Sequence, residues 1–319
     1  MGLSMSRSVL LSVFCLQLVY LLAPSAAAQT SATDKLAHAG LEREYYLHVP
    51  AAVEASGSEA VPLVVLLHGR GGTGAGMASL TDFDVVADAH GLIAVYPSGV
   101  DNQWNYVDAI PGYQIDVPDI AFLRALVADL STRYPVDPAR VYVAGFSNGG
   151  YMAQRLACDA ADLFAAFASV GAAGYGGQPS ICGEAEPVSI LFMHGTNDAV
   201  VPFGGLRQEG PNGPITVLAS VEQTFSYWAD RIGCSTTIDA RTVPSIRSPA
   251  MEVHVLDAED CPAQHELELV VVVGGGHNWP GQPDKLPVEV GGAVNLDLDA
   301  SRFIWEFFER HTLSAPEAP

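Results

Sequence analysis

The fold of this chain is decided by the stretch Val141-Tyr-Val-Ala-Gly-Phe-Ser-Asn-Gly-Gly-Tyr-Met-Ala-Gln-Arg-Leu-Ala157. Its first four residues are apolar throughout, which predicts a strand buried on both faces. Its last seven residues have the pattern of a helix. Between them, Gly145-Phe-Ser147-Asn-Gly149 matches the Gly-x-Ser-x-Gly sequence of a nucleophile elbow, a sharp strand-to-helix turn that presents a reactive serine. The glycines two residues before and after Ser147 leave room for that turn.

Apolar runs and helical patterns alternate on both sides of this stretch. Buried strands are predicted at residues 62–67, 92–96, 189–193 and 267–273, and an edge strand or hairpin arm of alternating polarity at 43–49. Helices are predicted at 120–130, with Asp116 as the cap and Pro118 in the first turn, at 221–232 and at 296–310. Such alternation indicates a mostly parallel sheet covered on both faces. Together with the elbow, it predicts the α/β-hydrolase fold.

A reactive serine needs a base, and His277 is the best candidate among the nine histidines. It stands in Gly274-Gly-Gly-His277-Asn-Trp-Pro, directly after the last predicted strand, where three glycines suit a tightly turned loop that delivers an imidazole into a cleft. His68 and His194 each end a buried strand and are interpreted as structural. His254 lies within a strand pattern, and the other five histidines lie in polar or peripheral segments.

The carboxylate that would orient the base is predicted to be Asp198, in His194-Gly-Thr-Asn-Asp198 just past the strand at 189–193. The chain order Ser147, Asp198, His277 is the order that this fold uses. Asp257, Glu259 and Asp260 also lie between the serine and the histidine and are the alternatives. They lie beside Cys261, in a segment that has the pattern of a solvated acidic loop.

Two backbone N–H groups are expected to form an oxyanion hole, one on Asn148 and the other on Arg70 in the loop His68-Gly-Arg-Gly-Gly72. That loop lacks the lysine and hydroxyl residue of a phosphate-binding loop, so we do not expect a phosphate there. Trp104 and Trp279 flank predicted strand ends and are predicted to wall a substrate pocket. Ordinary packing is the alternative for both.

The N-terminus has the organisation of a secretory signal peptide. Arg7 precedes an apolar run of about 14 residues, shorter than the roughly 20 of a membrane-spanning helix, and three alanines end at Ala28. We therefore expect residues 1–28 to be removed and the protein to be secreted or periplasmic, with a retained N-terminal anchor as the alternative. Residues 29–319 are expected to form a single catalytic domain, because no linker or repeat divides them.

Cysteine usage agrees with export, and the net charge limits the classes of partner. Four cysteines follow the leader, namely Cys158, Cys182, Cys234 and Cys261, and three disulfide pairings are formally allowed. We favour sequential pairing, which closes two short loops; free buried thiols are the alternative. No cysteine or histidine spacing indicates a metal site. The formal net charge of −21 opposes nucleic acid and anionic membranes as partners, and the sequence does not indicate an oligomeric state.

From about Arg43 to His311, the chain resembles the poly(3-hydroxybutyrate) depolymerase family of esterases and the related secreted feruloyl and acetylxylan esterases. The residues that carry this resemblance are Leu67-His-Gly69, Tyr96-Pro-Ser-Gly99, Trp104-Asn105, Phe122-Leu-Arg-Ala-Leu126, Val136-Asp-Pro-Ala-Arg-Val-Tyr142, Gly145 to Gly150, Leu156-Ala-Cys158, His194-Gly-Thr-Asn-Asp198 and Gly274 to Gly281.

The resemblance implies a serine esterase that forms an acyl-enzyme, with a triad of Ser147, Asp198 and His277, sequential disulfides and no cofactor. The implied substrates are small or oligomeric esters, either feruloyl and other aromatic esters or hydroxyalkanoate oligoesters. Two departures from the family pattern lie near the expected acyl pocket: Arg70 replaces a frequent cysteine, and Asp116-Val-Pro-Asp119 replaces paired aspartates. The alternatives are an acetylxylan esterase, lipase or peptidase of the same fold, and a catalytically silent binding protein.

Overall fold

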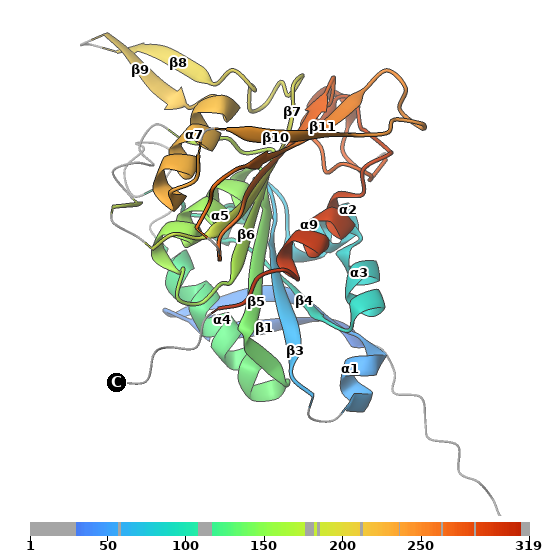
Figure 1. Ribbon diagram of the computed structural model, residues 1–319. Coiled ribbons are helices and arrows are strands. Elements are labelled where there is room, and N and C mark those ends of the chain that lie inside the picture. The colour runs from blue at the N-terminus through green and yellow to red at the C-terminus, as the bar shows by residue number, and fades with distance from the viewer. Residues whose placement is uncertain are drawn as a thin grey trace, which may run out of the picture.

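A twisted ten-stranded sheet runs through the centre of the molecule (Figure 1), in the order β1-β2-β4-β3-β5-β6-β7-β12-β11-β10. The computed structural model describes residues 30–56, 59–107, 117–175, 182–183, 186–210, 213–235, 237–262, 264–283 and 285–313. The expected signal peptide and Asp116 lie outside these residues. Within them, no helix combines the length and the apolar character needed to span a bilayer.

The central strands are parallel and the outer ones antiparallel. The parallel strands are β3 (Val61–Leu67), β4 (Ile93–Pro97), β5 (Val136–Phe146), β6 (Ala166–Val170), β7 (Ser189–Gly195) and β12 (Leu267–Val273). The antiparallel strands are β1 (Thr30–His38) and β2 (Leu41–Val49) at one edge, and β11 (Glu252–Ala258) and β10 (Ile238–Val243) at the other. A separate hairpin, β8 (Leu206–Gly210) and β9 (Gly213–Leu218), projects beyond the sheet (Figure 1).

Helices cover both faces of the sheet, because successive side chains of each central strand point to opposite sides. On β3, Leu63 and Val65 pack into one core with α4 (Asp119–Arg133), α5 (Asn148–Asp159) and α7 (Val221–Ile232). Val64 and Leu66 pack into a second core with α2 (Gly74–Thr81), α3 (Phe83–His90) and α9 (Ala300–Phe308). Two short helices, α1 (Ala51–Ser56) and α8 (Val288–Gly291), and a 3-10 turn at Val100–Asn102 complete the described elements. The predicted architecture is therefore confirmed.

Several elements differ from the predictions, among them one central strand and two helices. Strand β6 was not predicted, and it lies in the middle of the sheet between β5 and β7. Helix α4 begins at Asp119, with Pro118 in the N-cap position and not in the first turn. Helix α9 is shorter than the predicted 296–310, because the Asp299 side chain accepts a hydrogen bond from Arg302 N at 3.1 Å and thereby caps the helix there.

The parallel strands end level with one another, and this brings distant parts of the chain to one edge of the sheet. Phe146 at the end of β5 is paired with Val170 at the end of β6, and Val170 is paired with Met193 of β7. Gly195, the last residue of β7, is paired with Val272 of β12. Loops that follow these strands therefore meet at the carboxyl edge, where ligands bind in sheets of this type.

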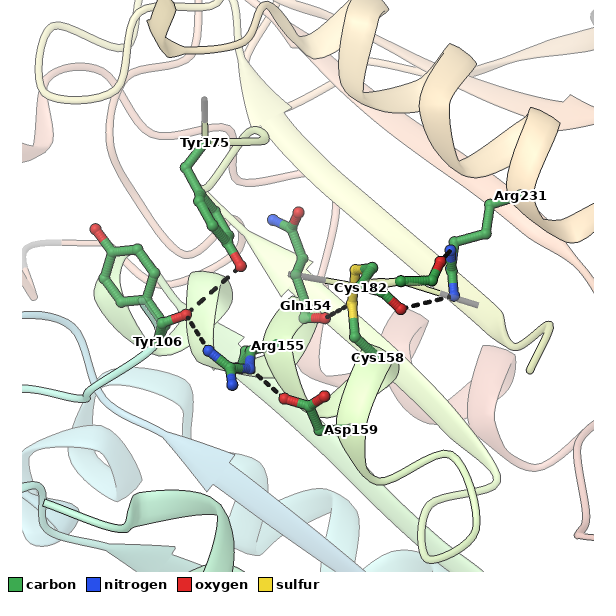
Figure 2. Close-up of a disulfide and its surroundings, with 9 residues drawn as sticks. Tyr106, Gln154, Arg155, Cys158, Asp159, Tyr175, Cys182 and Arg231 are labelled. Atoms are coloured by element: carbon green, nitrogen blue, oxygen red, sulfur yellow. Dashed lines mark hydrogen bonds and ion pairs between the residues drawn. A yellow bond between two sulfur atoms is a disulfide. The ribbon is translucent and has the colours of Figure 1, made fainter. Parts of the chain in front are cut away.

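Two disulfides join the cysteines in sequence, Cys158 to Cys182 and Cys234 to Cys261. Cys158 lies in the last turn of α5 (Figure 2), so the first disulfide ties the helix of the elbow to the chain beyond β6. Arg231 of α7 also holds this bridge, since its Nη2 donates to the carbonyl oxygen of Cys182 at 3.3 Å. The pairing is the one favoured from the sequence.

Removing the first disulfide with the double variant Cys158→Ala/Cys182→Ala should lower the free energy of unfolding by about 3 kcal/mol, because the unfolded chain regains the entropy of an open loop. Urea denaturation followed by circular dichroism measures this loss. The matched control is Cys234→Ala/Cys261→Ala, because the sequence separations of the two bridges, 24 and 27 residues, are similar and predict similar losses. A loss below about 1 kcal/mol in both variants would contradict the loop-closure explanation.

Candidate active site

Ser147 is the single residue between β5 and α5, and its backbone has a conformation that few non-glycine residues adopt. Its φ and ψ are 54° and −117°. The backbone N–H of Ser147 donates to Val170 O on β6 at 2.8 Å, which fixes the turn against the sheet. A Cβ atom on Gly145 would overlap the carbonyl oxygen of Gly149, and one on Gly149 would overlap that of Leu67. The two motif glycines are therefore required by close backbone approach.

Asp198 and His277 are in direct contact, although 79 residues separate them in the sequence. His277 Nδ1 donates to Asp198 Oδ2 at 2.7 Å, and both residues are buried. The other carboxylate oxygen, Oδ1, accepts from the backbone N–H groups of Val200 at 2.8 Å and Val201 at 2.7 Å. With Nδ1 bonded to the carboxylate, Nε2 of His277 is the ring nitrogen left to accept a proton.

The surroundings of Asp198 keep its carboxylate ionised at neutral pH. Burial alone would raise the pKa of Asp198, but the hydrogen bond and charge of His277 and the Val201 N–H outweigh it, so the pKa lies below 3.8. His194 packs on the same group, with its Nε2 donating to Val201 O at 2.8 Å and lying 3.4 Å from Asp198 Oδ2. Burial lowers the pKa of His194, which favours its neutral form. His194, interpreted as structural from the sequence, therefore packs against the Asp198 carboxylate as a neutral neighbour.

The imidazole of His277 lies next to the elbow. Its ring is 4.8 Å from that of Phe146, the residue before Ser147. In the described part of the chain, no hydrogen bond joins Ser147 to His277 in this conformation. Hydrogen bonds between such groups often shorten only when substrate binds. The structure thus brings Asp198 and His277 together, and it places the imidazole against Phe146, the residue that precedes Ser147.

Gly171, directly after β6, is a site residue that the sequence interpretation missed. Its φ is +61°, a conformation that favours glycine. A Cβ atom there would lie 3.2 Å from Phe146 Cε2 and 3.3 Å from both Cε1 and Nδ1 of His277. The absence of a side chain at Gly171 therefore leaves the space that the imidazole occupies beside the elbow. Recognition of the strand at 166–170 would have pointed to this glycine.

Both predicted oxyanion segments lie next to Ser147. Asn148 begins α5, where backbone N–H groups have no acceptor within the helix. Gly69 lies against the elbow, since a Cβ atom on it would be 3.3 Å from Ser147 Cβ. Arg70 follows at the surface. An open hollow of about 420 Å³ borders this loop, and its lining includes Arg70, Phe146 and Lys285.

Trp104 and Trp279 are both buried, with exposed fractions of 2% and 1%, and do not present a ring to solvent. The indole N–H of Trp104 donates to His68 O at 3.0 Å, and that of Trp279 donates to Ser301 Oγ at 3.0 Å. These contacts favour the packing interpretation over a substrate wall for both residues.

The alternative acids lie away from the site. Asp257 is paired in the sheet with Glu268, near the amino end of β12, whereas His277 follows its carboxyl end. Asp257 forms an ion pair with Arg241. Glu259 and Asp260 follow β11 at that same opposite end and are exposed. Within the described residues, no group of three histidine, cysteine, aspartate or glutamate side chains could hold a metal ion.

Comparisons with known proteins agree with this geometry. A model of the family described as "Esterase PHB depolymerase" matches residues 43–188. The protein NocK of Nocardia uniformis subsp. tsuyamanensis is named as an esterase. It is 31% identical to this chain over 293 residues, which cover 87% of this chain and 82% of NocK. Feruloyl esterase B of Piromyces equi is 29% identical over 70% of this chain and 40% of its own length. The structure of an acetyl xylan esterase from Aspergillus awamori has a TM-score of 0.57 at 17% identity, covering 89% and 99% of the two chains.

The space at Gly171 generates a prediction for activity. Gly171→Ala should lower the kcat for p-nitrophenyl acetate about 10-fold, because its methyl group would displace the imidazole by a few tenths of an ångström. The matched control is Gly91→Ala, since Gly91 has a similar φ of +66° and nothing within 4 Å of its added Cβ. Both variants should lose similar stability, but only the first should lose activity. Equal kcat in the two variants would refute this role of Gly171.

Proposed function

Since this chain belongs to the PHB depolymerase and feruloyl esterase-like family and is a carboxylic ester hydrolase of the α/β-hydrolase fold, we propose that it cleaves esters through an acyl-enzyme on Ser147. The observation that carries this proposal is the buried 2.7 Å hydrogen bond between His277 and Asp198 beside the strained turn of Ser147. A silent scaffold would have no need to keep either feature.

In the first half of the reaction, Ser147 Oγ attacks the carbonyl carbon of the ester while its proton passes to His277 Nε2. The negative charge that develops on the carbonyl oxygen is stabilised by the backbone N–H groups of Asn148 and Arg70. The C–O bond to the alcohol then breaks, and the leaving oxygen takes the proton from His277. The acyl group remains on Ser147 as an ester.

In the second half, water attacks the acyl-enzyme and gives its proton to His277 Nε2. The bond between the acyl carbon and Ser147 Oγ breaks, Oγ recovers the proton, and the carboxylic acid leaves. Asp198 stays ionised throughout and stabilises the imidazolium that forms in each half. Its lowered pKa supports this role.

The substrate class follows from the relatives. The name of the Piromyces equi protein indicates feruloyl esters, and the family name indicates hydroxyalkanoate esters, so both acyl classes are proposed for this chain. Initial rates on methyl ferulate and on hydroxybutyrate oligomers decide between them. A secreted or periplasmic location is part of the proposal, and the two disulfides support it because such bridges persist in oxidising compartments.

The variant Ser147→Ala should lower kcat/KM for p-nitrophenyl acetate by roughly 10⁴-fold or more, because it removes the nucleophile and leaves only binding and the oxyanion hole. It should also abolish labelling by a fluorophosphonate probe. Ser226→Ala is the control, since Ser226 is exposed on α7 and should retain wild-type rates and labelling. Wild-type rates in Ser147→Ala would eliminate the acyl-enzyme proposal, and an unlabelled wild type would favour the silent scaffold.

A further inference from the structure

Trp104 connects two segments of the site that are far apart in sequence. It lies in the loop between β4 and α4 and is buried. Its backbone N–H donates to Asn148 Oδ1 at 2.7 Å, and its indole N–H donates to His68 O at 3.0 Å. Its ring also contacts that of His68, with 5.1 Å between the centroids. One residue is thus bonded both to the first residue of α5 and to the loop after β3.

The two partners of Trp104 are the segments that carry the proposed oxyanion donors. Asn148 carries one N–H itself, and its side chain is held by the bond from Trp104 N. His68 lies two residues before Arg70, which carries the other N–H. Oxyanion donors act at 2.7–3.1 Å from the developing charge, so their separation must be held within a few tenths of an ångström. Trp104 is bonded to the side chain of one donor residue and to the segment that carries the other.

The loop of Trp104 makes further bonds to the glycine loop after β3. Gly99 N donates to His68 Nε2 at 2.9 Å, and Gly71 N donates to Asn102 O at 2.7 Å. The side-chain amide of Asn102 donates to Gly72 O at 2.8 Å. The glycine loop is therefore fixed to the Trp104 loop along its length, and Trp104 joins the pair of loops to α5.

The buried ion pair between Arg43 and Asp119 anchors the loop that contains Trp104. Asn105 N donates to Asp119 Oδ2 at 2.8 Å, and Arg43 Nη2 donates to Asp119 Oδ1 at 2.6 Å. Arg43 and Asp119 have exposed fractions of 2% and 1%, and the guanidinium lies 3.9 Å from the centre of the Phe122 ring. A buried carboxylate with both oxygens bonded is a rigid support, since breaking such a pair leaves an uncompensated buried charge.

From these contacts we propose that Trp104 is a positioning residue that holds the N–H groups of Asn148 and Arg70 in register with one another. It acts through its two hydrogen bonds and does not touch the substrate. The inference rests on the proposed function, because the oxyanion hole has a role only if Ser147 forms an acyl-enzyme.

The test is Trp104→Phe, which keeps a ring in the core and the backbone N–H but removes the bond to His68 O. The kcat for p-nitrophenyl acetate should fall about 10-fold with KM within about twofold. The glycine loop would lose its alignment with Asn148, and this loss affects only the transition state, because the oxyanion develops there. The matched control is Tyr142→Phe. It also removes a buried side-chain donor to a backbone carbonyl, the 2.7 Å bond from Tyr142 Oη to His311 O, and should keep wild-type kcat.

Two further readouts separate positioning from a loss of structure. An aryl trifluoromethyl ketone, whose adduct with serine carries an oxyanion, should bind Trp104→Phe more weakly by the same factor as kcat/KM falls. Asn148→Ala cuts the other bond of Trp104 and keeps the N–H of residue 148, so it should give a similar loss. The double variant should lose less than the product of the two losses, because both changes release the same contact between loops.

Several outcomes would overturn the inference. Equal kcat in Trp104→Phe and Tyr142→Phe would do so, as would a loss confined to KM or unchanged affinity for the ketone. If Trp104→Phe does not fold, Asn148→Ala tests the same bridge, and wild-type kcat in that variant would overturn it. Failure of the proposed function is distinguished by the Ser147→Ala result: wild-type rates there remove the acyl-enzyme itself, whatever Trp104 does.

Discussion

The backbone of Ser147 is the constraint on which the rest of the site depends. A serine with φ of 54° and ψ of −117° costs on the order of 1–3 kcal/mol, and it persists only where its surroundings determine it. The surroundings here are of three kinds: glycines that permit close backbone approach, the bond from Ser147 N to Val170 O, and a helix whose far end is held by the Cys158–Cys182 disulfide. Because β5 and β6 are central strands, the turn is bonded directly to the middle of the sheet.

Asp198 and His277 are positioned by the same edge of the sheet, through the loops that follow β7 and β12. Asp198 lies three residues past β7, and its carboxylate is held by two backbone N–H groups of its own loop before it meets the histidine. His277 lies four residues past β12 and reaches back across Gly171 toward β5. The carboxylate is thus fixed by local bonds, whereas the imidazole depends on its contacts with Asp198, Phe146 and the space above Gly171.

Sequence patterns predicted β2, the parallel strands other than β6, and the helices α4, α5, α7 and α9. They also predicted the meeting of Asp198 with His277, because apolar runs and strand-end loops are local signals. They did not predict β6, whose sequence Ala-Phe-Ala-Ser-Val contains two alanines and a serine and so lacks the β-branched, strongly apolar character of its neighbours. Gly171 was missed with it. The sequence left open whether the two tryptophans wall a pocket or pack in the core. Burial of a ring at a strand end depends on non-local partners, and Trp104 is 44 residues from Asn148 and 36 from His68.

The position of Trp104 follows from how this fold builds its oxyanion hole. One proposed donor belongs to the N-terminus of α5, directly after β5, and the other to the glycine loop after β3. β3 and β5 are neighbours, yet the loop beyond the end of β3 is no longer held by the ladder between them. A third segment has to supply the missing contacts, and it must itself be anchored elsewhere. Asn105, next to Trp104, is bonded to Asp119, and Asp119 is paired with Arg43 on β2. The Trp104 loop is therefore anchored to a strand that carries neither proposed donor.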